Sequence, residues 1–499
     1  MHRYYLALFF VTVSFIPSRE KKMLMLTLPL TKYSPRDHFT LMKILSGKLA
    51  HRTDHEITFF IQSRRKHKLP RDVKELALSS SLSEKEEENF GHALRQHSKS
   101  LLRRNSSSEG KHSELLRSTF VQECKKMLTD SNFIERVEKE NFDLLIIDQF
   151  FTYLDASVPT PMSWVPPLFS GFPDDMNYGQ RIQSVILHYS LSYFASKLYK
   201  EYSDLKDSLN ISPSKSIWDI RANSLLWLIN SDLSFDYPRP LTPNIVHVGG
   251  MITEKSNENL DRDFLSLASH PFGIVSIDSE HDFCADEEFL FFLAEELSKV
   301  NDIEWIWSLR CPVNSGPMTV HQFRRIPRPA LLENPNCRLI ITNGDLNSIY
   351  EAVKAAVPLL IIPISGDGID NGARLRKKGV AEVYDGRNDK FTKLVPKIRN
   401  LIENTSYLNA SIQLSAIFND FSPKPTEKAI FWINHVAKFG ADHLRPAVNN
   451  LSTFQRYLFD VWMLIIFLIL IVLLIIIFVT VCLVRCCWKL LKRNKTKSE

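Results

Sequence analysis

The sequence predicts an α/β protein with two open, mostly parallel sheets, because strands and helices alternate in two separate stretches of the chain. In the first stretch, Met23 to Leu30 and Glu56 to Ile61 are apolar runs typical of buried strands. Apolar residues recur at helical spacing between them, from His38 to His51. A strand, helix and strand in this order are typical of a parallel unit, and Phe142 to Asp148 predicts a later strand of the same sheet.

The second stretch repeats the alternation. Strands are predicted at 272–278, 303–309, 338–342 and 358–363, with helices at 288–300 and 346–355. The Pro-rich segment 237–243 breaks regular structure and predicts a boundary between the two domains. Residues 63–118 are rich in Ser, Lys, Glu and Arg with little periodicity, so exposed loops and loosely packed helices are expected there.

Both ends of the chain predict a membrane protein. The apolar run Tyr4 to Ile16 follows basic residues, is stopped by Pro17 and charged residues, and is too short to span a bilayer. It is typical of a signal peptide ending near Ser18, with a buried first strand as the alternative. Val461 to Val484 carries no charge and exceeds the roughly 20 residues needed to cross the hydrocarbon core. Basic residues follow it, which predicts a cytosolic tail and a type I single-pass protein.

The C-terminal residues KTKSE place Lys495 and Lys497 five and three positions from the end. This resembles the K-x-K-x-x retrieval signal of endoplasmic-reticulum membrane proteins, although a solvated basic tail is the alternative. The formal charge of +6 is small for 499 residues, and the basic residues before the tail are scattered. The sequence therefore predicts no nucleic-acid partner.

Two candidate catalytic residues follow predicted strands of the first sheet. His38 begins the helix after the first strand, and Asp148 ends the later strand. Because ligands collect at the carboxyl ends of parallel strands, both side chains can reach one crevice. A histidine held by a carboxylate is suited to act as a general base. From pattern alone, a solvated or capping histidine at a helix start is the alternative.

A candidate anion site lies in the second sheet, where the turn Asn343-Gly344-Asp345 joins a strand to a helix. Free backbone N–H groups and the helix dipole favour an anion there. Asn347 and Ser348 add polar groups in the first turn, and Glu351 lies one turn further on the same face, where a carboxylate could accept two hydroxyls. Asp367 follows the next strand at the same edge. The alternative is that Asn347 and Ser348 only cap the helix and that Glu351 is solvated.

Together, these segments resemble the membrane-bound UDP-glucuronosyltransferase type of the UDP-glycosyltransferase family. The resemblance covers nearly the whole chain and also includes 124–148, PNIVHVGG at 243–250 and HLRPA at 443–447. It implies the GT-B fold, in which two facing Rossmann-like domains bind an acceptor and a UDP-sugar. The implied parts are a signal peptide at 1–18, an acceptor domain at 19–242, a donor domain at 243–420, a return segment at 421–460, a transmembrane helix at 461–484 and a tail at 485–499.

The family mechanism is a single displacement with inversion and needs no metal and no cofactor beyond the UDP-sugar co-substrate. His38 and Asp148 match the base that deprotonates the acceptor and the aspartate that steadies the resulting imidazolium. The donor-site residues that the resemblance implies are Ser279, Arg325, Arg328, Asn343, Gly344, Asn347, Ser348, Glu351, Asp367 and Gly368.

The donor side departs from the family pattern at several positions. The usual W-x-P-Q reads RIPR at 325–328, the usual T-H-G-G reads TNGD at 342–345, and the usual Asp-Gln pair reads DG at 367–368. At about 4 Å, a charge on Asp345 would repel a diphosphate by roughly 1 kcal/mol in water and roughly 4 at a dielectric of 20. Arg325 and Arg328 could offset this repulsion. Restoring Gln at 368 and Gly at 345 is expected to strengthen donor use.

The resemblance implies an endoplasmic-reticulum enzyme whose lumenal domains conjugate small lipophilic acceptors such as phenols, alcohols or steroids. Glucuronic acid or glucose is the expected sugar, and homo- or hetero-oligomers with related transferases are expected partners. The alternative is a weak or inactive homologue that binds a ligand or an active partner. Lumenal glycosylation sequons begin at Asn105, Asn210, Asn404, Asn409 and Asn450.

Overall fold

A computed structural model of the chain describes residues 20–27, 36–63, 67–103, 109–148, 160–222, 224–253, 259–277, 287–309, 319–364, 366–386, 389, 391–420, 424–447, 451–456 and 458–495. The chain forms two compact units, Met1–Leu444 and Arg445–Glu499. The predicted signal peptide lies outside the described residues.

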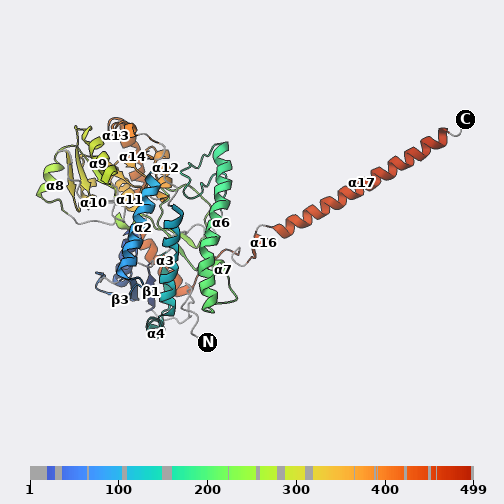
Figure 1. Cartoon of the computed structure of the whole chain (residues 1–499), viewed down its shortest axis with the longest axis horizontal. Helices are drawn as coiled ribbons and strands as arrows, with labels where there is room; N and C mark the ends of the chain where they lie inside the picture. The colour runs from blue at the N-terminus through green and yellow to red at the C-terminus, as the bar shows by residue number, and fades with distance from the viewer. Residues whose placement is uncertain are drawn as a thin grey trace. The chain divides into compact units, whose positions relative to one another are not determined.

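The first part of the larger unit is a four-stranded parallel sheet in the order β3-β2-β1-β4 (Figure 1). Its elements are β1 (Lys22–Leu26), α1 (Arg36–Arg52), β2 (Glu56–Gln62), β3 (Val73–Leu78), α2 (Glu84–Arg103), α3 (Glu109–Thr129), α4 (Ser131–Glu140) and β4 (Leu144–Ile147). The predicted parallel arrangement is confirmed for β1, β2 and β4.

Both faces of this sheet are covered, which explains the continuous apolar runs of its strands. Met23 and Met25 face a cluster that includes side chains of α1, whereas Leu24 and Leu26 pack with side chains of α3 and α4. The prediction for residues 63–118 was wrong in one respect, because β3 extends the sheet in parallel with β2. Only Val73, Leu76 and Leu78 of β3 are buried at this edge, so its apolar pattern is weak.

A middle segment follows, with α6 (Tyr178–Ser208), α7 (Ile217–Ala222), β5 (Trp227–Ile229), β6 (Ile245–His247) and the 3₁₀ turn η1 (Met251–Thr253). The 31-residue helix α6 begins with a capping box, in which Asn177 and Gln180 each bond the other's backbone N–H. Strands β5 and β6 form a separate parallel pair. Val246 and Val248 pack into the cluster that contains Met23 and Met25.

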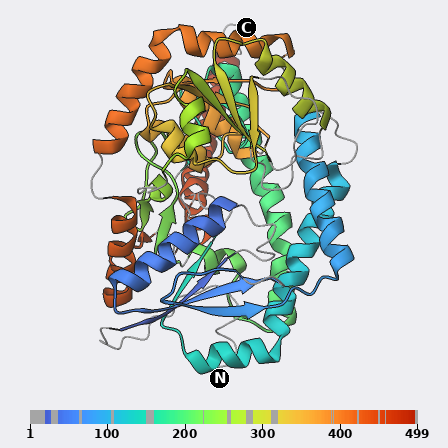
Figure 2. The ribbon, with the colours of Figure 1, turned by 90° about the vertical axis from the view of Figure 1, so that its left-hand side faces the viewer.

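The second large sheet has six parallel strands in the order β12-β11-β10-β7-β8-β9. Its elements are α8 (Arg262–Leu267), β7 (Phe272–Ser276), α9 (Glu287–Ser298), β8 (Glu304–Ser308), β9 (Val320–Phe323), α10 (Arg328–Leu332), β10 (Cys337–Thr342), α11 (Leu346–Lys354), β11 (Leu359–Ile361), α12 (Gly366–Lys377), β12 (Ala381–Val383), the 3₁₀ turn η3 (Phe391–Lys393), α13 (Leu394–Glu403) and α14 (Thr405–Asp420). Figure 2 shows this yellow and orange sheet above the blue four-stranded one.

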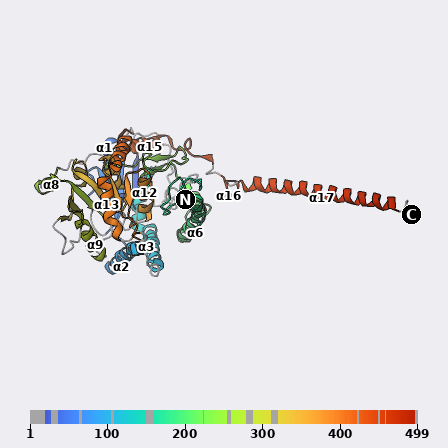
Figure 3. The same ribbon diagram turned by 90° about the horizontal axis from the view of Figure 1, so that it is seen from above.

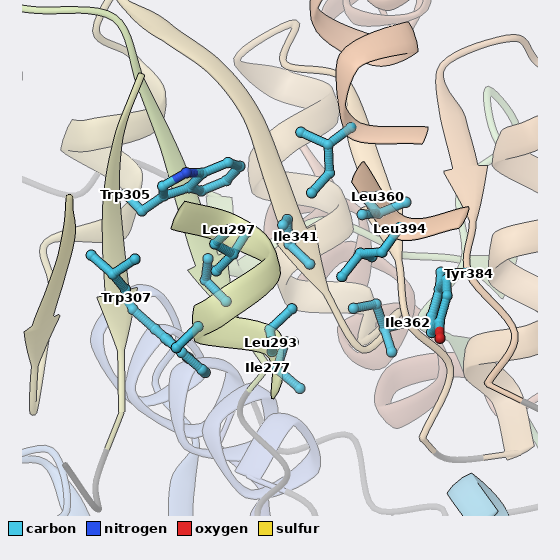
Figure 4. Packing of buried hydrophobic residues seen from close by; sticks show 14 of the residues in the cluster. Ile277, Leu293, Leu297, Trp305, Trp307, Ile341, Leu360, Ile362, Tyr384 and Leu394 are labelled. Atoms are coloured by element: carbon cyan, nitrogen blue, oxygen red, sulfur yellow. The ribbon is translucent and has the colours of Figure 1, made fainter. Parts of the chain in front are cut away.

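Helices cover both faces of the six-stranded sheet. On one face, Leu293 and Leu297 of α9 and Leu394 of α13 pack against Trp305 and Ile341 of the strands (Figure 4). The opposite face carries a second cluster, in which residues of α11 and α14 pack against alternate strand residues. This doubly covered α/β architecture is the predicted fold class.

The chain then returns to the first sheet. Ala429 and Ile433 of α15 (Pro425–Phe439) belong to the same buried cluster as Leu41 and Leu45 of α1. Figure 3 shows α1 and α15 side by side. The domain boundaries given above stay predictions, because the larger unit forms a single compact body.

The second unit contains α16 (Thr453–Arg456) and the long helix α17 (Phe459–Lys495). Its segment Phe459–Arg485 has a mean hydropathy of 3.8, and among the described residues it is the one helix long and apolar enough to cross a membrane. The predicted span 461–484 lies within it.

Candidate active site

The two predicted catalytic residues are in contact. His38 lies in the first turn of α1, and Asp148 directly follows β4. Strands β1 and β4 are parallel neighbours, and the Asp148 amide donates to the Leu26 carbonyl at 3.0 Å. The carboxyl ends of both strands therefore meet at one edge, where His38 Nδ1 lies 2.7 Å from Asp148 Oδ1.

The pair has the polarity of a general base and its supporting carboxylate. An ionised carboxylate only accepts hydrogen bonds, so Nδ1 carries the proton and Nε2 is the nitrogen that can accept one. The Asp148 side chain is 11% exposed, and its second oxygen has no hydrogen-bond partner among the described residues. The carboxylate therefore acts mainly on the His38 ring and fixes its orientation.

The candidate donor site is built on three neighbouring strands of the six-stranded sheet. Thr342 ends β10 and pairs in register with Ser276 of β7 on one side and Ile361 of β11 on the other. The turn 343–345 and α11 follow β10, and α12 begins five residues after β11. The sequence predicted this common edge, because parallel strands place their carboxyl ends together.

The N-terminus of α11 is capped by Asp345. Its Oδ1 accepts the Ser348 N–H at 2.8 Å, and its Oδ2 accepts the Thr342 hydroxyl at 3.0 Å. A fixed carboxylate thus occupies the helix end that the sequence suggested as an anion site. The capping alternative for Asn347 and Ser348 is wrong, since Asp345 is the cap residue.

The loops at this edge are in close backbone contact. Gly344 has φ +90°, and a Cβ placed there would lie 2.8 Å from the Gly368 Cα. A Cβ at Gly368 would lie 2.4 Å from the Asn343 carbonyl oxygen. The effect of Gln at position 368 on donor use stays a prediction, and the structure opposes it, because any side chain there would displace the Asn343 turn.

Glu351 is not a solvated side chain, because it is paired with Arg328. Arg328 Nε donates to Glu351 Oε2 at 2.5 Å, and Arg328 Nη1 donates to Ser276 Oγ at 2.7 Å. The Glu351 side chain is only 8% exposed. Arg328 thus bridges the end of β7 to α11 through its contacts with Ser276 and Glu351.

The other predicted donor residues differ in their surroundings. Asn347 and Ser348 are buried in α11, and the Ser348 hydroxyl has no hydrogen-bond partner among the described residues. Arg325 and Asp367 are exposed. Ser279 lies outside the described residues.

Three residues of this edge were missed from the sequence. The Asn371 amide donates to the Gly344 carbonyl at 2.9 Å, while Thr342 and Ser276 bind Asp345 and Arg328 as described. In the sequence, Ser276 and Thr342 are only polar residues at strand ends, and Asn371 is only a polar residue one helical turn after Gly368. Their partners come from other elements, so spacing along the chain could not identify them.

Helix α12 is tied to the segment that precedes α6. Asp370 accepts the N–H groups of Phe169 at 2.6 Å and Gly171 at 2.8 Å. Burial raises the pKa of the Asp370 carboxyl above its ordinary value, and the nearby Arg374 and the two amides oppose that rise. Asp236 forms an ion pair with Arg374 at 3.1 Å. These contacts fix the helix that carries Asp367 and Gly368.

Within the described ranges, no group of three or more His, Cys, Asp or Glu side chains is arranged to hold a metal ion.

Solved glycosyltransferases share this architecture. The glycotransferase of kitacinnamycin aligns with a TM-score of 0.53 and 14% identity over 84% of this chain and 99% of its own. Spinosyn forosaminyltransferase SpnP aligns with a TM-score of 0.53 and 13% identity over 84% of this chain and 100% of its own. At this identity the likeness shows the fold, which is GT-B.

Sequence relatives are more informative about the family. UDP-glucuronosyltransferase 2C1 of Oryctolagus cuniculus is 30% identical over 373 residues, which cover 68% of this chain and 73% of that protein. The 2-hydroxyacylsphingosine 1-beta-galactosyltransferase of Mus musculus is 28% identical over 370 residues, covering 68% of each chain. Residues 151–497 match the family described as "UDP-glucoronosyl and UDP-glucosyl transferase", so the chain belongs to this family of UDP-glycosyltransferases.

Proposed function

We propose that the protein transfers a hexose from a UDP donor to a hydroxyl of a small lipophilic acceptor, with inversion at the anomeric carbon. The 2.7 Å contact between His38 and Asp148 is the observation that carries this proposal. His38 Nε2 takes the acceptor proton while the acceptor oxygen bonds to the anomeric carbon. The bond from that carbon to UDP breaks in the same step, and UDP leaves with the electron pair.

The sugar and the acceptor are narrower parts of the proposal. Glucuronic acid, glucose or galactose is the expected sugar, in keeping with the names of the family and its relatives. Phenols, alcohols or steroids are the expected acceptors. The UDP-sugar is the co-substrate, and the proposed mechanism uses neither a metal nor another cofactor.

We also propose that α17 crosses the endoplasmic-reticulum membrane once, with the catalytic unit lumenal and Lys495 and Lys497 as a cytosolic retrieval signal. Asn210, Asn404 and Asn409 are exposed and thus open to glycosylation, while Asn105 and Asn450 lie outside the described residues. Oligomers with related transferases remain expected partners. Resistance of the whole chain to endoglycosidase would contradict the topology, and unchanged retention after Lys495→Ser and Lys497→Ser would contradict the signal.

A second candidate is a weak or inactive homologue that binds ligand or an active partner. Two observations favour it: Arg328 occupies the Glu351 carboxylate, and Asp345 places negative charge at the α11 N-terminus. Both oppose binding of UDP in the manner expected for the family.

Microsomes that express the chain, incubated with radiolabelled UDP-sugars and a panel of phenols, distinguish the two. Transfer by the wild type that disappears in His38→Ala, with UDP binding retained, supports the enzyme. Asp148→Asn should lower turnover by a similar factor, since a base contributes roughly 10² to 10⁴ in rate. No transfer by the wild type, together with weak or absent UDP binding, supports the non-catalytic homologue.

A further inference from the structure

One face of α6 carries a stripe of exposed apolar and aromatic side chains. The residues of this α6 stripe are Tyr178, Ile182, Val185, Ile186, Tyr189 and Tyr193. Apart from the neighbours Val185 and Ile186, consecutive members are three or four positions apart, so all six share one face of the helix. Tyr178 is 74% exposed, Ile186 59% and Tyr189 63%.

The opposite face of α6 holds the helix on the protein. Ser184 is fully buried and donates to the Met162 carbonyl at 2.9 Å. Figure 1 shows α6 as a long green helix at the margin of its unit. The stripe therefore faces away from the buried cores, and such rows of exposed apolar residues mark a contact surface.

Basic side chains accompany the aromatic rings. Lys197 Nζ lies 4.8 Å from the centre of the Tyr193 ring, and the Arg181 guanidinium lies 5.9 Å from that of Tyr178. Tyrosine with Lys or Arg beside apolar residues is the composition that favours the interface between lipid headgroups and acyl chains.

The chain itself limits how far this unit lies from a bilayer. Fourteen residues, 445–458, join it to α17. Fully extended, they span at most about 50 Å, given 3.3–3.6 Å per residue. A bilayer is thus always within reach of the larger unit, whereas a second copy must first be encountered.

We propose that the α6 stripe contacts the surface of the bilayer that α17 crosses. This rests on the membrane span proposed above. The apolar side chains would enter the boundary between headgroups and acyl chains, and Arg181 and Lys197 would lie at the headgroups. The partner is a lipid surface rather than a protein.

The test uses the full chain, one copy per phosphatidylcholine nanodisc, with the photoreactive residue benzoylphenylalanine replacing Tyr189. The matched control places it at Phe291 of α9, an exposed aromatic residue far along the chain from the stripe. After irradiation, mass spectrometry should find phosphatidylcholine adducts at position 189 several-fold above those at 291. The double change Ile182→Glu and Ile186→Glu, both at exposed positions, should remove most of the adduct at 189.

Equal adducts at both positions, or none at 189, would overturn the proposal. Cross-links between two chains in crowded vesicles, without lipid adducts, would assign the stripe to a second copy instead. Failure of the chain to co-elute with nanodiscs would show that the proposed span is wrong, which is a separate result. The measurement needs no sugar transfer, so it is independent of catalysis.

Discussion

Arg328 Nε donates to Glu351 Oε2 at 2.5 Å, and the two side chains are only 20% and 8% exposed. The pair joins the start of α10 to the middle of α11 at the carboxyl edge of the six-stranded sheet. In the family pattern the first position is Gln, which has no charge to hold a carboxylate. In this chain, any hydroxyl group of the proposed donor that is to bind Glu351 must compete with a guanidinium.

Replacing Arg328 by Gln is expected to strengthen UDP binding about tenfold or more, because a hydrogen bond to a charged group is worth roughly 1.5–3 kcal/mol. The unpaired Glu351 should also lower the thermal unfolding midpoint of the free protein. Calorimetry with UDP on the detergent-solubilised chain measures the first effect. Arg324→Gln changes an exposed arginine nearby and should alter neither quantity. Unchanged UDP affinity in folded Arg328→Gln would show that the pair does not oppose the donor.

Asp345→Asn is expected to raise UDP affinity while keeping the cap of α11. Asn caps a helix about as well as Asp but carries no charge, so only the repulsion from the diphosphate is removed. Calorimetry should show an increase on the order of tenfold, at the lower end of the Coulomb estimate. Asp345→Ala also loses the cap and should lower the free energy of unfolding by about 1 kcal/mol. If Asp345→Asn binds UDP with wild-type affinity, the charge of Asp345 is screened from the diphosphate and does not oppose its binding.

Gly368→Ala is expected to destabilise the protein by roughly 1–3 kcal/mol, because its Cβ overlaps the Asn343 carbonyl. UDP affinity should fall as well, since the displaced turn leads into α11. Gly179→Ala in α6 is the control, because its Cβ would meet no described atom closer than 3.5 Å. Thermal unfolding compares the two variants. If Gly368→Ala has the unfolding midpoint of the wild type, the two loops can move apart enough to admit a methyl group.

His247 should make stability depend on pH. Burial lowers the pKa of this histidine below its ordinary value of 6.5, although nearby Asp236 opposes the shift. Below pH 6.5, His247 binds a proton more readily in the unfolded chain than in the folded chain. The free energy of unfolding is therefore highest above pH 6.5 and falls as the pH decreases. His247→Gln should flatten the change in unfolding midpoint between pH 7.5 and 5.5. The exposed His270→Gln should leave it as in the wild type. If the unfolding midpoint changes equally with pH in the wild type, His247→Gln and His270→Gln, His247 is not the source of the pH dependence.

The sequence by itself determined the α/β class, the span in α17 and the alignment of His38 with Asp148. These depend on local signals: apolar runs, helical spacing, and the rule that parallel strands end at one edge. The strands β3 and β9 were missed because short strands at sheet edges are only partly buried and so lack a clear pattern.

Only the tertiary structure decided the state of the donor site. Arg328 and Glu351 are 23 residues apart, and Asn343 meets Gly368 across two loops. The sequence showed that Arg328, Asn343 and Gly368 differ from the family pattern, but not that Arg328 pairs with Glu351 or that Asn343 meets Gly368. An ion pair and a steric contact depend on distances between separate elements, which packing of the sheet and its helices sets and spacing along the chain does not.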